Sequence, residues 1–96
     1  MSAKRNRQRG KEVERAIARR LNGRRVGLMG GEDVAHDRFS VEVKSRQKFA
    51  GEAFMAQAKR NAPEGKIPVA VVHVHGKAHD NDLVMVRLQD FERLLE

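Results

Sequence analysis

Two oppositely charged side chains, Glu42 and Lys44, alternate with valine in the segment FSVEVKSR, residues 39–46. Successive side chains of a β-strand point to opposite faces, so a strand here would place Ser40, Glu42 and Lys44 on one face. A carboxylate offers a hard oxygen ligand to a divalent cation such as Mg²⁺, and an ammonium on the same face would lie beside whatever the cation binds. The pair alone is more often an exposed strand surface, so a phosphodiester site needs a second acid.

Asp33 supplies that second acid if a hairpin turning at residues 37–38 lays its strand beside residues 39–44. Two carboxylates brought together in this way would repel each other, and a shared cation removes the repulsion. Glu14, in a segment with helical periodicity, could add a third carboxylate directly or through water, which suits the hydration of Mg²⁺. The other nearby acids fit less well: Asp37 in the turn, Glu32 on the opposite side from Asp33, and Glu12 in solvent.

These side chains depend on a predicted succession of helices and strands. Apolar residues at helical spacing predict a first helix from Lys11 to a stop at Asn22-Gly23. Strands are predicted at 26–29, 33–35 and 39–44, a second helix within 50–62, two further strands within 67–76 and 83–88, and a closing helix over 89–96. The order α-β-β-β-α-β-β-α predicts an α/β protein with a mixed sheet flanked by helices.

Positive charge is concentrated toward the N-terminus. The 96 residues contain 20 Lys and Arg against 13 Asp and Glu, and half of these cations precede Val26. Phosphate contacts by such cations release counterions and favour nucleic acid, with solubility or acidic lipid as the alternatives. We interpret residues 1–10 as a flexible basic arm and residues 11–96 as one domain. The residues expected to contact DNA are Lys4, Arg5, Arg7, Arg9, Lys11, Ser40 and Arg46.

Several classes of protein and site are disfavoured by composition. The chain has no cysteine, which excludes disulfides, thiolate metal ligands and cysteine nucleophiles, and no Trp or Tyr, so single-stranded bases would find few stacking partners. No apolar run approaches the ~20 residues that span a bilayer. We therefore expect a cytoplasmic protein without membrane contact or small-molecule cofactor. His73, His75 and His79 could form a zinc site, although polar outer residues of a valine-rich strand are the favoured interpretation.

The combination of motifs resembles the PD-(D/E)xK nucleases, and within them the archaeal-type Holliday junction resolvases and their small phage relatives. The resemblance rests on RGKEVERAIARRL with its acid at Glu14, on GGEDVAH with Asp33, and on FSVEVKSR with Glu42 and Lys44. Gln57, in AFMAQAKR, lies where many such enzymes carry a glutamine on the helix behind the motif. The similarity extends from the basic arm to the last strand.

This resemblance implies a restriction-endonuclease-like fold and metal-assisted hydrolysis of a DNA phosphodiester. It assigns Mg²⁺, with Mn²⁺ as a substitute, to Asp33, Glu42 and the backbone carbonyl of Val43, with Glu14 in the outer shell. Lys44 would orient or help deprotonate the attacking water and offset negative charge on the phosphate, while Gln57 would orient water or Lys44.

It further implies a homodimer that cuts a four-way junction at two equivalent sites, acting in DNA recombination or repair in the cytoplasm, or in the host cytoplasm if a phage encodes it. Two alternatives stay open from the residues themselves. One is a nuclease that nicks ordinary duplex DNA, and the other is a DNA-binding module without catalytic activity.

Overall fold

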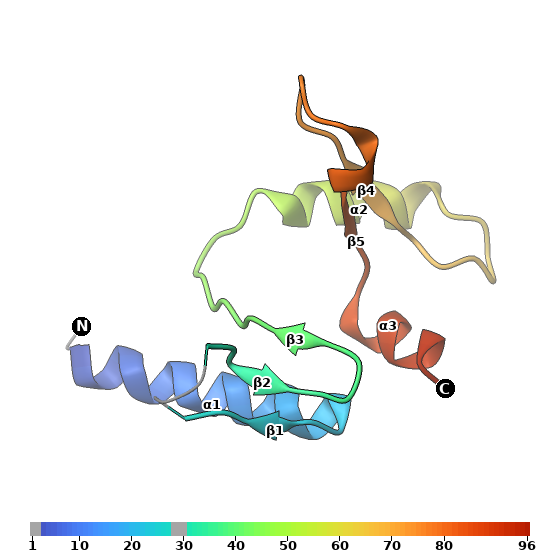
Figure 1. The fold of residues 1–96 in the computed structure, drawn as a ribbon. Coiled ribbons are helices and arrows are strands. Elements are labelled where there is room, and N and C mark those ends of the chain that lie inside the picture. Colours follow the sequence, from blue (N-terminus) through green and yellow to red (C-terminus); the bar gives the residue numbers. More distant parts are fainter. Residues whose placement is uncertain (1–2, 28–30) are drawn as a thin grey trace. The chain divides into compact units, whose positions relative to one another are not determined.

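The computed structural model describes residues 3–27 and 31–96 and divides after residue 47 into two units (Figure 1). Each unit has its own antiparallel sheet; the first contains α1, and the second contains α2 and α3. Along the chain the elements run α1, β1, β2, β3, α2, β4, β5 and α3, with a short 3₁₀ helix, η1, before β5. The α/β class is therefore confirmed. The strands form two small antiparallel sheets rather than one mixed sheet, so the restriction-endonuclease-like arrangement stays a prediction.

Helix α1 spans Ala3–Leu21 and begins well before Lys11, so residues 3–10 are helical rather than a flexible arm. The segment lacks apolar periodicity, but that periodicity reports packing and not helix formation itself. Its lysine, arginine and glutamine side chains lose little rotamer freedom in a helix, and they extend the helix that the apolar residues nucleate further along. The basic residues of the N-terminus are therefore presented from a regular element.

The predicted stop at Asn22-Gly23 is confirmed. Asn22 adopts a left-handed conformation with φ of 59°, and its amide donates to the carbonyl of Arg19. The Gly23 amide donates to the carbonyl of Ala18 at 2.8 Å, which completes a Schellman motif. A Cβ atom on Gly23 would clash with the carbonyl oxygen of Ala35, so glycine allows β1 to pass close to β2.

The first unit, residues 1–47, contains a three-stranded sheet in the order β1-β2-β3. Strand β1 spans Arg24–Arg25, β2 spans Val34–Ala35 and β3 spans Ser40–Val41, and each pairs antiparallel with its neighbour. The prediction of a first strand at 26–29 is wrong for residues 26 and 27, because the strand lies just before them, at Arg24–Arg25. The rest of the predicted strand, 28–29, lies outside the described residues. The turn predicted at residues 37–38 is present, where the Arg38 amide donates to Nδ1 of His36 at 3.0 Å.

The core of the first unit lies where α1 packs on β1 and β2. Ala18 and Leu21 contribute from the helix, and Val34, with no exposed surface, contributes from the sheet. Branched Val34 suits a strand and fills the centre of this contact. A unit of this size has a small core, so each buried methyl group matters to stability.

Replacing Val34 with alanine should lower the free energy of unfolding by about 2 kcal/mol, because two buried methyl groups are lost and a cavity remains. Urea denaturation followed by circular dichroism measures the change. Val74→Ala is the matched control, since Val74 is 52% exposed and its substitution should change stability by about 0.5 kcal/mol or less. Equal effects of the two substitutions would contradict the assignment of Val34 as the core residue.

The second unit, residues 48–96, contains α2 (Gly51–Asn61), β4 (Ala70–Val72), η1 (His79–Asn81), β5 (Leu83–Met85) and α3 (Leu88–Leu94). The predicted second helix is confirmed, and strands form within both predicted ranges. Strands β4 and β5 pair antiparallel with Val72 opposite Leu83. Helix α2 packs against β4 and buries Met55.

Among the described residues, no helix combines the length and the apolar character needed to cross a membrane.

Candidate functional site

Asp33 lies beside the segment that contains Glu42 and Lys44. Its carboxylate oxygen Oδ2 accepts a hydrogen bond of 2.7 Å from the amide of Val43, in a half-buried position. The Asp33 amide also donates to the Val41 carbonyl, although the strand register pairs Val41 with Val34. Two successive residues thus oppose one, as in a β-bulge, a feature that redirects side chains. The hairpin therefore brings the acid to residues 42–44, as its sequence position predicts.

Glu42 and Lys44 lie on the same side of the chain, as strand alternation predicts. The Lys44 ammonium is 3.0 Å from Oε1 of Glu42, and both side chains are more than half exposed. Strand β3 ends at Val41. The alternation of side chains therefore continues into residues 42–44, which follow the strand and are not part of the three-stranded sheet. An exposed ion pair of this kind contributes little to stability, which leaves both groups able to exchange partners.

Ser40 and Glu32 form a contact that the sequence interpretation did not foresee. The Ser40 hydroxyl donates to Oε2 of Glu32 at 2.6 Å, so this hydroxyl is already engaged where a phosphate contact was expected. The sequence prediction placed Glu32 on the opposite side from Asp33, because it took the strand to be uninterrupted and its side chains to alternate strictly. The bulge at Asp33 shifts that alternation, and strand periodicity alone carries no signal of such a shift.

Glu14 is partly buried, but it has a different partner from the expected one. Its carboxylate lies 3.5 Å from Nε of Arg25 on β1, and the side chains are 20% and 26% exposed. This ion pair joins α1 to β1. It also compensates a guanidinium nitrogen that is buried without a hydrogen bond.

The predicted cradle of three carboxylates is not formed. Among the described residues, the one group of three acidic or histidine side chains whose ligand atoms all lie within 4.8 Å of one another is in the second unit. Each of the three acids has its own partner instead: Glu14 contacts Arg25, Asp33 contacts the Val43 amide, and Glu42 contacts Lys44. Asp33 reaches the backbone of Val43, between Glu42 and Lys44, whereas Glu14 is paired with Arg25.

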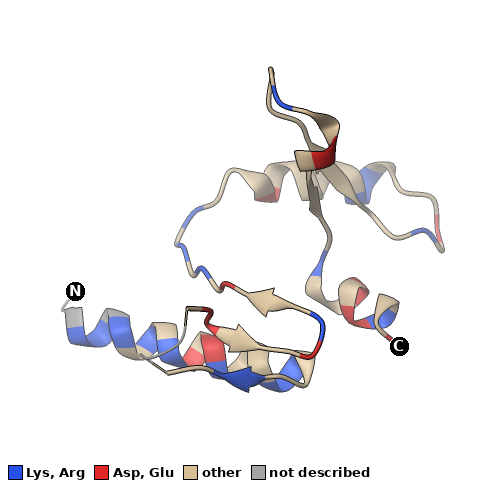
Figure 2. Ribbon diagram, viewed as in Figure 1, with Lys and Arg blue, Asp and Glu red and all other residues tan. Residues whose placement is uncertain are grey.

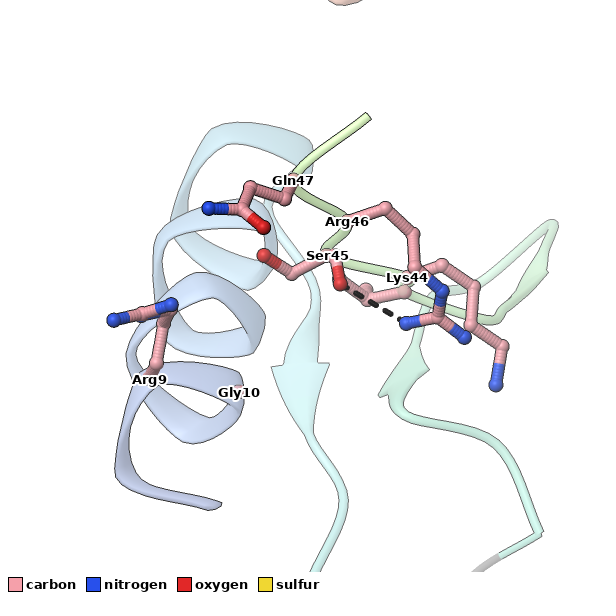
Figure 3. Close-up of a pocket in the computed structure, with 7 residues that line it drawn as sticks. Arg9, Gly10, Lys44, Ser45, Arg46 and Gln47 are labelled. Atoms are coloured by element: carbon pink, nitrogen blue, oxygen red, sulfur yellow. Dashed lines mark hydrogen bonds between the residues drawn. The ribbon is translucent and has the colours of Figure 1, made fainter. Parts of the chain in front are cut away.

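A pocket of about 360 Å³ lies between α1 and the segment that follows β3 (Figure 3). Ser45 and Gln47 point toward α1, while Lys44 and Arg46 point away from it. The Arg46 guanidinium donates to the Ser45 carbonyl at 2.9 Å. The pocket is lined by Arg9, Gly10, Val43, Lys44, Ser45, Arg46 and Gln47.

Three basic residues line this pocket, and the sequence analysis predicted a different role for each of them. Arg9 comes from the expected arm, Lys44 from the expected catalytic strand and Arg46 from the expected DNA contacts. Ser45 and Gln47 were missed, although extending the alternation beyond Lys44 would have placed them together on the opposite side. The three cations belong to one region of the first unit, although Lys44 and Arg46 point away from α1, and their summed charge creates a positive potential suited to a phosphate group.

Basic residues also occupy much of α1 (Figure 2). Lys4, Arg7 and Lys11 are exposed, and their spacing places them on one face of the helix. Arg5 and Arg9 are exposed as well and lie on an adjoining face. Five of the expected DNA contacts are therefore presented by one helix of the first unit.

Gln57 lies in α2 of the second unit with an exposed side chain. Its expected part in orienting water or Lys44 stays a prediction. The second unit also contains the close group noted above, which consists of His73, His79 and Asp82.

Comparison of the chain with protein-family models, with curated proteins and with solved structures gives no significant match. Its function must therefore be inferred from the residues and contacts just described.

Proposed function

We propose that this protein is a Mg²⁺-dependent endonuclease that binds DNA through α1 and hydrolyses a phosphodiester bond at Asp33, Glu42 and Lys44. The hydrogen bond from the Val43 amide to Asp33 Oδ2, at 2.7 Å, supports this most strongly. It holds an acid from one strand at the middle residue of the Glu42-Val43-Lys44 segment. A metal-dependent nuclease needs this juxtaposition, whereas simple DNA binding does not.

The donors at this position suit Mg²⁺ in kind. Carboxylate and carbonyl oxygens are its preferred protein ligands, and it keeps several waters, so few protein ligands suffice. Asp33 can accept further bonds beside the one from Val43, because a carboxylate has about four lone-pair sites. Asp33, Glu42 and the Val43 carbonyl would hold the ion, with Mn²⁺ as a substitute. Glu14 is assigned to the ion pair with Arg25 rather than to the outer shell.

The protein's own groups would position the substrate. Lys44, now paired with Glu42 at 3.0 Å, would transfer to a phosphate oxygen and offset the charge that develops there. Arg9 and Arg46, which line the same pocket, would hold an adjacent phosphate. When bound, Mg²⁺ polarises the phosphate and lowers the pKa of a coordinated water.

The proposal includes a branched substrate and a homodimer, because resolving a four-way junction requires paired incisions and a C₂ dimer provides two equivalent sites. In the second unit, Val71 and Val84 face each other across β4 and β5 and are 62% and 64% exposed. An exposed apolar pair on a sheet face is suited to burial against a second copy.

The proposed activity is tested with labelled four-way junction, linear duplex and single-stranded DNA in Mg²⁺, Mn²⁺ or EDTA. We expect cleavage in either metal, none in EDTA, and symmetric paired cuts in the junction. Equal cutting of linear duplex would replace junction resolution with duplex nicking. Binding of DNA without cleavage in both metals would overturn the nuclease assignment in favour of a DNA-binding module, which the basic surface of α1 would suffice to explain.

A further inference from the structure

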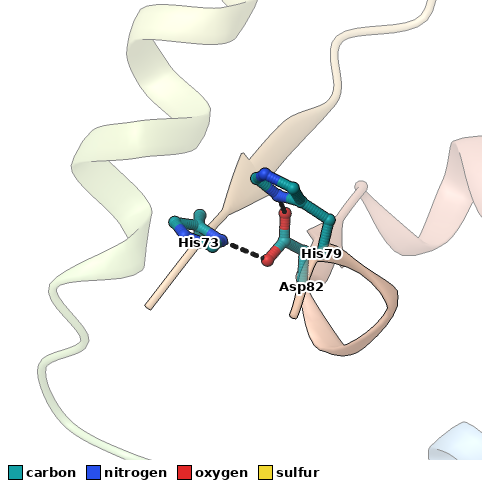
Figure 4. Close-up of side chains that lie close together, drawn as sticks. All are labelled: His73, His79 and Asp82. Atoms are coloured by element: carbon teal, nitrogen blue, oxygen red, sulfur yellow. Dashed lines mark hydrogen bonds and ion pairs between the residues drawn. The ribbon is translucent and has the colours of Figure 1, made fainter. Parts of the chain in front are cut away.

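We propose that His73, His79 and Asp82 form a second metal site, specific for a transition-metal ion such as Zn²⁺. Nδ1 of His73 lies 2.6 Å from Oδ1 of Asp82, and Nδ1 of His79 lies 3.0 Å from Oδ2 of the same carboxylate (Figure 4). The two imidazole rings are 4.4 Å apart between centroids. Three potential ligand atoms thus converge on one point. This site is independent of the proposed nuclease function.

The backbone holds these residues in place. His73 follows β4 and Asp82 precedes β5, and the pairing of Val72 with Leu83 brings these two positions to the same end of the two-stranded sheet. His79 begins η1, whose turn is closed by a hydrogen bond from the Asp82 amide to the His79 carbonyl at 3.0 Å. Main-chain structure on both sides of the site therefore limits how far the ligands can move apart.

The ligand set indicates the kind of ion. Two imidazole nitrogens and one carboxylate oxygen suit Zn²⁺, Co²⁺, Ni²⁺ or Cu²⁺, whereas Mg²⁺ and Ca²⁺ prefer oxygen ligands alone. Zinc sites with three protein ligands complete their coordination with water. The 83% exposure of the His79 side chain leaves an open side for that water, while Asp82 is only 15% exposed.

The distances require a modest adjustment. Zinc binds nitrogen and oxygen at about 2.0–2.2 Å, so two of its ligand atoms in tetrahedral geometry lie about 3.3 Å apart. The observed separations of 2.6 and 3.0 Å are shorter by about 0.7 and 0.3 Å. Rotation of the exposed His79 ring and a small shift of His73 supply that difference. The sequence had grouped His73 and His79 with His75, whose ring centroid lies 6.3 Å from that of His73, and Asp82 takes its place.

Such a site would brace the connection between β4 and β5. A ligand that binds the folded state alone stabilises it in proportion to the logarithm of its concentration over its dissociation constant. Bound Zn²⁺ would tie the two strand ends to η1 and so raise the unfolding temperature of the protein.

The test titrates the full chain, freed of any histidine tag and of metal, with Co²⁺ and with Zn²⁺. With excess Mg²⁺ present to occupy the proposed nuclease site, we expect one Co²⁺ per chain with visible absorption typical of nitrogen and oxygen ligands, displacement of this Co²⁺ by Zn²⁺, and a higher unfolding temperature with Zn²⁺. His79→Ala and Asp82→Asn should each weaken Co²⁺ binding about tenfold or more.

His75→Ala and Asp80→Asn are the matched controls, because they remove the same groups from neighbouring exposed positions. Both should bind Co²⁺ as the parent protein does. His79 is so exposed that its loss should leave the metal-free circular dichroism spectrum unchanged, which separates a binding defect from misfolding. Equal Co²⁺ affinity in the parent protein and in His79→Ala would overturn the site and leave a hydrogen-bonded His-Asp-His group.

Discussion

Asp33→Asn should reduce Mg²⁺-dependent DNA cleavage by about 10³-fold, because loss of a metal-ligand charge removes several kcal/mol of transition-state stabilisation and each 1.4 kcal/mol is about tenfold in rate. DNA affinity should stay close to that of the parent protein. The asparagine carbonyl can still accept the hydrogen bond that Asp33 now accepts from the Val43 amide, so the local fold should persist. Single-turnover cleavage and fluorescence anisotropy measure the two quantities.

Asp37→Asn provides the control for this experiment. It makes the same change in net charge within the same hairpin, but Asp37 is an exposed residue of the turn. Its cleavage rate should match that of the parent protein. If both variants cleave at the parent rate, or if both lose activity together, Asp33 has no specific part in the reaction and the site is misassigned.

Replacing Lys4, Arg7 and Lys11 together with glutamine should weaken DNA binding and make it less dependent on salt. Each phosphate contact on duplex DNA contributes about 0.9 to the slope of log K against log salt, so loss of three contacts should make that slope less negative by about 2.7. Glutamine has nearly the helix propensity of lysine and arginine, so α1 should remain intact. Anisotropy titrations over a series of salt concentrations give the slope.

The matched control replaces Lys59, Lys66 and Lys77 with glutamine. These residues are exposed and belong to the second unit, and their substitution removes the same amount of positive charge. Their loss should change the slope much less than the loss of the α1 cations. Identical slopes for the two triple variants would show that α1 makes no specific phosphate contacts and that only net charge matters.

The parts of the fold that follow from local chemistry could be predicted from the sequence. The stop of α1 follows from the tolerance of Asn22 and Gly23 for the backbone geometry of a helix end, and the structure shows it. The approach of Asp33 to residues 42–44 follows from a short turn between two extended segments. Both depend on residues close in sequence, where turn and cap preferences are strongest.

Features that depend on competition between partners could not be predicted. Glu14 was expected near the metal ligands, but its carboxylate is paired with Arg25 on β1 instead. Helical periodicity shows which face of α1 Glu14 lies on, but not which charged side chain it will contact. The bulge at Asp33 changes which side chains share a face without changing any apolar pattern. Asp82 contacts His73 because the pairing of β4 with β5 brings the two residues to the same end of the sheet. That contact depends on the strand register, which spacing along the sequence does not give.

The helical state of residues 3–10 sets the density of positive charge along the N-terminus. In a helix, successive residues rise about 1.5 Å along the axis, so Lys4, Arg7 and Lys11 occupy intervals of about 4.5 and 6 Å. An extended arm would spread the same three charges over intervals of about 10 and 13 Å. Phosphates along one DNA strand repeat about every 3.4 Å of the helix axis. Folding of this segment therefore brings the linear charge spacing of the protein much closer to that of the polymer it is proposed to bind.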